Sequence, residues 1–164
     1  MTISNLKDVY IDQLQDLYSA CEQSEPMTRK LAAVSKSSYL KQALEDGADG
    51  IADGKRAVAK LIEGHGAKPS GEFCKGMEGL VKEAKAHGLD ADFSDDDSRD
   101  AMIITQYQRM VHYGIAGWGC LVAFAGRLGL DEERDVLQKC LDDTYGGDKR
   151  MSAIAMGEVN KKAA

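Results

Sequence analysis

The chain contains 164 residues, with 21 Lys and Arg against 27 Asp and Glu, which gives a formal net charge of −6. A net negative charge argues against a nucleic-acid-binding surface as the main function. The apolar runs are far shorter than a membrane span, and the first residues lack the pattern of a signal peptide. We therefore expect one cytoplasmic domain over residues 1–164, with no nucleic-acid or membrane partner.

The first two predicted elements are long helices, identified by apolar periodicity and end signals. One extends over residues 4–34, and Pro26 is expected to kink or interrupt it. The other extends over residues 38–63 and ends at the Gly-His-Gly sequence 64–66. Scarce proline, with 2 residues, and the absence of alternating strand patterns also favour helices.

A short helix over residues 72–87 is predicted next. The acidic loop 90–97 then leads into a fourth helix, which ends at about Leu128 and has Ser94 or Asp95 as its expected N-cap. The longer connection between the second and fourth helices suggests a crossover, and the short helix would lie within it.

The fifth helix is predicted over residues 132–159. Gly129 would end the helix before it, Asp131 would be its N-cap, and the glycine pair 146–147 is a candidate break. Four long helices and one short helix fit an all-α four-helix bundle with a crossover.

Glycine is unexpectedly frequent for a helical protein, because 17 glycines make up about 10% of the chain against a usual ~7%. Three of them share the apolar face of the second helix, and each costs about 1 kcal/mol of helix propensity relative to alanine. That face is Leu40, Ala43, Leu44, Gly47, Gly50, Ile51, Gly54, Val58 and Leu61.

The other long helices also place small or polar residues at the middle of their apolar faces. Gly114 is central in the fourth helix, among Tyr107, Met110 and Trp118. Gln13 is central in the first helix, and Thr144 and Asp148 are central in the fifth. In an antiparallel bundle these positions could converge at one depth.

Three interpretations of this layer remain open, besides a metal site. Glycine could allow close helix approach, or large side chains (Trp118, Tyr107, Tyr113 or Met110) could fill the vacated space. The third interpretation is a pocket for a small ligand, since bundles place sites between their helices. The candidate pocket residues are Gln13, Gly47, Gly50, Gly54, Tyr107, Gly114, Trp118, Thr144 and Asp148.

The four cysteines are widely spaced, and none has a partner at zinc-ligand spacing. We expect free, partly buried thiols in a reducing compartment. A redox role or a disulfide among Cys21, Cys74, Cys120 and Cys140 stays open, because spacing does not reveal pairing.

Three stretches, in the same order along the chain, resemble motifs of the YciE/YciF ferritin-like family. They are LKDVYIDQLQDLYSA at residues 6–20, CKGMEGLVKE at residues 74–83, and HYGIA at residues 112–116 leading to LGLD at residues 128–131. The resemblance covers nearly the whole chain. It implies a ferritin-like helical bundle that is dimeric, bacterial and linked to stress responses, and that in many members carries a di-metal carboxylate site.

The departures from the family pattern concern that site. The resemblance implies acidic residues where this chain has Gln13, Cys21 and Thr144, and a segment rich in Glu, with His or Gln, around Gly47, Gly50 and Gly54. The family's Glu-His-Tyr-Glu matches Val111, His112, Tyr113 and Gly114.

A di-metal site of this kind needs several inward carboxylates, usually with imidazoles. Only Asp148 remains as an inward acid in the predicted central layer, and Asp49 and Asp53 are expected to be solvated. His65 and His87 lie at predicted helix ends, and His112 lies roughly opposite Gly114. We therefore expect neither a metal nor a cofactor, and the glycines would leave space where acidic ligands stood.

Three functions follow from these observations. The first is a metal-free, non-catalytic bundle that acts as a stress-associated binding or structural protein, as a homodimer. The second is a small-ligand or enzymatic pocket, with hydrogen bonds from Gln13, Thr144 and Asp148, and Asp148 as a candidate acid or base. The third is residual di-iron or di-manganese oxidase chemistry, which fold alone does not establish. Whether the protein is an enzyme stays open.

Overall fold

The computed structural model describes residues 2–164, and every regular element within that range is a helix. The principal helices are α1 (Leu6–Val34), α2 (Ser38–Gly64), α3 (Lys75–Ala84), α4 (Asp96–Leu128), α5 (Asp131–Ile154) and α6 (Asn160–Ala163). A short 3-10 turn precedes α3, and wider helical turns continue α3 to Asp90 and α5 to Val159.

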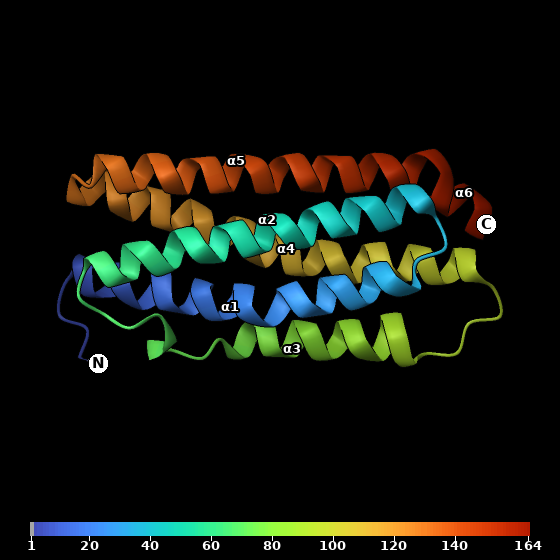
Figure 1. Cartoon of the computed structure of the whole chain (residues 1–164), viewed down its shortest axis with the longest axis horizontal. Coiled ribbons are helices and arrows are strands. Elements are labelled where there is room, and N and C mark those ends of the chain that lie inside the picture. The colour runs from blue at the N-terminus through green and yellow to red at the C-terminus, as the bar shows by residue number, and fades with distance from the viewer. Residues whose placement is uncertain (1) are drawn as a thin grey trace.

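The bundle consists of two helical hairpins side by side (Figure 1). α1 packs on α2, α4 packs on α5, and α3 lies in the crossover along α1 and α4. In Figure 1, α3 and α5 lie on opposite sides of the elongated molecule. The predicted all-α bundle with a short crossover helix is therefore confirmed.

Side-chain caps mark the starts of α1 and α4, and the cap of α4 at Asp95 is one of the two predicted positions, whereas α3 begins at Lys75, three residues later than predicted. Asn5 caps α1 by accepting a hydrogen bond from the Asp8 backbone N–H at 3.0 Å, and Asp95 caps α4 by accepting from the Ser98 N–H at 2.8 Å. Each cap satisfies a backbone donor that the helix itself leaves unpaired. Gly129 ends α4 in the left-handed conformation, with φ of +70°, as glycine commonly does at this position.

Two local predictions are wrong, and a third is wrong in part. Asp131 is the first residue of α5 rather than its N-cap, and the capping residue Leu130 makes no side-chain cap. α5 continues through the glycine pair 146–147, and α1 continues through Pro26, so Pro26 does not interrupt the helix. Buried residues lie on both sides of Pro26 and of the glycine pair, for example Met27 in α1 and Met151 in α5. Their tertiary packing keeps each helix continuous, because it outweighs the local helix propensity.

The core follows the predicted faces of α2 and α4 closely. Leu40, Leu44 and Val58 of α2 are fully buried, although Ile62 replaces Leu61 as the last buried residue of that face. The buried face of α4 includes Ile103, Tyr107, Met110, Trp118, Leu121 and Ala125.

Among residues 2–164, no helix is long and apolar enough to cross a membrane.

Candidate ligand-binding site

A cavity of about 990 Å³ lies between α1, α2, α4 and α5. Its inner wall comes mainly from apolar and small side chains, and its exposed lining residues all belong to α2 and α5. The cavity therefore opens to solvent between these two helices. Seven of the predicted pocket residues line it: Gly47, Gly50, Gly54, Tyr107, Gly114, Trp118 and Thr144.

Two glycines of α2 make room for aromatic side chains of α4. A Cβ atom on Gly47 would collide with the hydroxyl of Tyr107, and a Cβ on Gly54 would lie 3.0 Å from the Trp118 ring. These two positions match the expectation that large side chains fill the space that glycine vacates. Close packing also occurs at Gly117, where a Cβ would lie 3.0 Å from Leu17.

The remaining glycines of the cavity face open space. A Cβ on Gly50 would meet no heavy atom within 4 Å, and the same holds for Gly146 and Gly147 of α5. A Cβ on Gly114 would make only an ordinary contact of 3.7 Å with Trp118. Large side chains therefore fill only part of the space that the glycines leave, and an unfilled space remains between Tyr107 and Trp118.

Two buried polar groups of α4 face this space. The side chains of Tyr107 and Trp118 are each only 4% exposed, and both line the cavity. Within residues 2–164, the one fully buried side-chain nitrogen or oxygen without a hydrogen-bond partner is Arg99 Nε, so the Tyr107 hydroxyl and the Trp118 indole N–H are not sealed off from the cavity space. Burial raises the pKa of the Tyr107 phenol to about 12, and the charge of Asp148 adds to this effect. The phenol is therefore a neutral donor at physiological pH.

The other polar side chains of the inner wall are internally satisfied. The Thr144 hydroxyl donates to the Cys140 carbonyl oxygen at 2.6 Å, and the Ser24 hydroxyl donates to the Cys21 carbonyl oxygen at 3.5 Å. All four cysteines are free thiols. Burial raises the pKa of the Cys21 thiol to about 12, so it stays protonated at neutral pH.

The rim of the cavity is charged, and its charges are paired. Asp46 accepts from Arg150 at 2.5 Å across the opening, and Lys139 donates to Asp143 at 2.5 Å. The lining includes five acidic residues against two basic ones: Asp46, Asp49, Asp53, Asp135 and Asp143 against Lys139 and Arg150.

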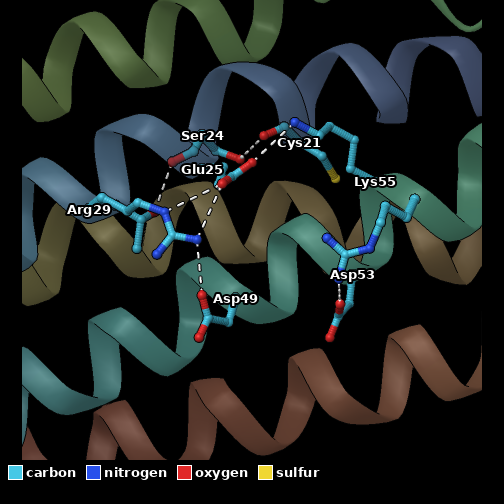
Figure 2. Close-up of polar contacts among 9 residues, drawn as sticks. Cys21, Ser24, Glu25, Arg29, Asp49, Asp53 and Lys55 are labelled. Carbon is cyan, nitrogen blue, oxygen red and sulfur yellow. Dashed lines mark hydrogen bonds and ion pairs between the residues drawn. The ribbon is translucent and has the colours of Figure 1, made fainter.

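A network of ion pairs joins α1 to α2 beside the rim (Figure 2). Glu25 of α1 accepts from Lys55 of α2 at 3.1 Å, and Arg29 donates to Asp49 at 2.9 Å. Burial tends to raise the pKa of Glu25, but hydrogen bonds from Lys55 and Arg29 outweigh it and hold that pKa below its ordinary value. Asp49 and Asp53 are exposed, as predicted.

Two predicted pocket residues lie elsewhere. Gln13 is exposed and donates to Asp12 at 3.1 Å, because the inward face of α1 passes through Leu14 and Leu17 instead. The buried glutamine is Gln15, which donates to the Lys68 carbonyl oxygen at 2.7 Å beneath the connection that follows α2.

Asp148 lies on the side of α5 that faces α4, outside the cavity lining. Its carboxylate accepts from the Gln108 amide at 3.0 Å and lies 3.1 Å from His112 Nε2. The cavity wall of α5 passes through Gly147, one residue earlier. A shift of one residue on a helix turns a side chain by about 100°, which explains both errors of position.

Two clusters outside the cavity could not be predicted from the sequence. Midway along the bundle, Tyr113 of α4 donates to Asp16 of α1 at 2.8 Å and lies 2.9 Å from the Cys74 sulfur. At one end of the bundle, Glu133 accepts from Tyr10 at 2.7 Å and lies 3.1 Å from His65 Nε2. These residues are widely separated in sequence, and only tertiary packing brings them together.

The donor set does not fit a di-metal carboxylate site. The inner wall carries Cys21, Gly114 and Thr144, whereas the carboxylates of the rim are held by arginine and lysine side chains. Within the described residues 2–164, no group of three or more His, Cys, Asp or Glu is arranged to hold a metal ion.

Comparison with known proteins gives a consistent family relationship. Protein YciF of Escherichia coli strain K12 is 29% identical over 164 residues, which cover 99% of this chain and 98% of YciF. The crystal structure of the E. coli stress protein YciF superposes with a TM-score of 0.88 at 28% identity, covering 97% of this chain and 99% of that chain.

A second solved structure, YcfI from Rhodopseudomonas palustris, superposes with a TM-score of 0.86 at 27% identity. The match covers 93% of this chain and 96% of YcfI. These likenesses confirm the ferritin-like bundle and the resemblance to YciF. The family described as a domain of unknown function (DUF892) matches residues 5–164, and the chain belongs to this family.

Proposed function

We propose that this protein is a metal-free, non-catalytic ferritin-like bundle that serves in the cytoplasm as a stress-associated binding or structural protein. YciF is named a stress protein, and YcfI is described as "a putative structural protein". The observation that carries the proposal is the inner wall of the central cavity, which includes Cys21, Gly114 and Thr144, whereas every carboxylate of the lining belongs to an exposed, ion-paired residue of the rim.

The chemistry of this wall supports the metal-free state. Di-metal sites in ferritin-like bundles need several inward carboxylates to balance the metal charge. A cysteine binds metal as a thiolate, and the raised pKa of Cys21, about 12, makes its deprotonation unfavourable. The rim carboxylates of Asp46 and Asp49 are already paired with Arg150 and Arg29.

Elemental analysis of the protein purified from its own cells tests this proposal. We expect iron and manganese far below one ion per chain, also after aerobic incubation with ferrous iron. The matched control is the variant Cys21→Glu/Gly50→Glu/Gly114→Glu/Thr144→Glu, which places four carboxylates on the cavity wall and should increase iron binding. Stoichiometric iron or manganese in the natural chain would contradict the proposal.

We also propose that the protein forms a homodimer, as the resemblance to the YciE/YciF family implies. Sedimentation equilibrium over a wide range of protein concentrations measures the mass in solution directly. A mass of twice the chain mass is expected, and a mass equal to that of the single chain at all concentrations would contradict the dimer.

A further inference from the structure

We propose that the central cavity is a binding site for a neutral, largely apolar small molecule that carries a hydrogen-bond acceptor such as a carbonyl oxygen. This inference rests on the proposed metal-free centre, because two metal ions with their ligands would occupy the same space. Elemental analysis and ligand titration test the two proposals separately, so the failure of one is distinguishable from the failure of the other.

The size of the cavity is the first argument. Protein interiors are close-packed and rarely keep large voids. The volume of about 990 Å³ lies at the upper end of the range of about 300–1,000 Å³ that is typical of small-molecule sites. The opening between α2 and α5 gives a ligand a route to the inner wall.

The shape of the cavity follows from two aromatic residues that lie against α2. Tyr107 packs at Gly47 and Trp118 packs at Gly54, seven residues further along α2, which corresponds to about 10 Å of helix. Gly50 lies between these positions on the same helix face and meets no atom within 4 Å. The open space therefore has the length of a small ring system and an aromatic side chain at each end.

The Trp118 indole forms a wall of this space that reaches across two helices. A Cβ on Gly114 would lie 3.7 Å from the indole nitrogen, and a Cβ on Gly54 would lie 3.0 Å from the far ring edge. Aromatic faces pack favourably on flat apolar groups. A planar, apolar ligand thus complements this wall.

The donors of the inner wall identify the polar feature of the ligand. Tyr107 and Trp118 are each 4% exposed and line the cavity, and their polar atoms are not among the fully buried ones, so water in the cavity can pair with them. An indole N–H can only donate, and a phenol hydroxyl can donate. A ligand oxygen that accepts a hydrogen bond could take the place of that water.

The charges favour a neutral ligand. Each of the five rim carboxylates is paired with an arginine or lysine side chain, and the two basic residues of the lining, Lys139 and Arg150, are taken up by these pairs, so the opening offers an anion no free cation. The inner wall holds no free carboxylate that could pair with a cation, and burying an unpaired charge is strongly unfavourable. A neutral molecule avoids both penalties.

The natural fluorescence of the chain provides the assay, because Trp118 is its single tryptophan. The full chain is titrated with Prodan, a neutral naphthalene that carries a ketone. We expect saturable quenching of Trp118 with energy transfer to the bound probe. Gly50→Leu and Gly147→Leu fill the space from opposite walls and should each abolish this signal. Gly79→Leu on α3, where an added Cβ also meets open space, is the matched control and should bind as the natural chain does.

The acceptor is tested with Tyr107→Phe, which keeps the ring and removes the hydroxyl. We expect Prodan to bind about three- to tenfold more weakly to this variant, and anthracene, a hydrocarbon without an acceptor, to bind equally to both forms. The proposal is overturned if Prodan gives no saturable quenching, or if it binds undiminished to folded Gly50→Leu and Gly147→Leu. Tighter binding of the anion anilinonaphthalene sulfonate than of Prodan would overturn the assignment of a neutral ligand.

Discussion

Alanine substitutions at Gly47 and Gly50 should change the free energy of unfolding in different ways, although the two residues are only one turn apart in α2. An added Cβ at Gly50 meets no heavy atom within 4 Å. Alanine is favoured over glycine in a helix by about 1 kcal/mol. Gly50→Ala should therefore raise the free energy of unfolding by about 1 kcal/mol.

The same substitution at Gly47 adds a collision. Its Cβ would overlap the Tyr107 hydroxyl and lie 3.1 Å from the ring carbon that carries it. Overpacking a core typically costs about 1–3 kcal/mol, which offsets or exceeds the same gain in helix propensity. The propensity term cancels between the two variants, so Gly47→Ala should be less stable than Gly50→Ala by about 1–3 kcal/mol.

Urea unfolding, followed by far-UV circular dichroism and by Trp118 fluorescence, measures both values. The double variant Gly47→Ala/Tyr107→Phe should regain part of the loss, because the colliding oxygen is absent, and the resulting double-mutant cycle isolates this contact. Equal stabilities of Gly47→Ala and Gly50→Ala would refute the assignment of Tyr107 to the space beside Gly47.

Three further predictions concern other parts of the molecule. Gly129→Ala should lower the free energy of unfolding by about 1–2 kcal/mol, because φ of +70° is strained for alanine; thermal unfolding measures this. The ion pair of Glu25 with Lys55 should stabilise the folded chain by at most about 1 kcal/mol above the ordinary carboxyl pKa. This stabilisation should be lost as the pH falls through the lowered pKa that Glu25 has in the folded state. If the difference in free energy of unfolding between the natural chain and Glu25→Gln stays constant across acid pH, this prediction is contradicted. Iodoacetamide at neutral pH should label exposed Cys120 well before buried Cys21, whose pKa is raised to about 12, as peptide mass spectrometry would show.

The helices and their faces could be predicted because apolar periodicity and end signals are local properties. For this reason α4 has Asp95 as its N-cap and ends at Gly129, as predicted. Pro26 shows the limit of such signals, since its unfavourable effect on α1 is small beside the burial of the surrounding helix face.

The candidate site could be predicted in part. The glycines of α2 and the aromatic residues of α4 share strong periodic faces, and they meet at the cavity. The predictions that Gln13 and Asp148 line the cavity were wrong, because a polar residue beside an apolar stripe can lie on either side of it. An error of one position along the helix turns the side chain by about 100°. Their true partners, Asp12 and Gln108, depend on packing that the linear pattern does not contain.

The metal content of the purified protein tests the central claim most directly, namely that this bundle keeps a cavity where a di-metal carboxylate site would stand. After aerobic loading with ferrous iron and removal of unbound metal, we predict that iron remains negligible per chain. A pair of iron ions retained by each chain, with the optical spectrum of a bridged centre, would contradict the account.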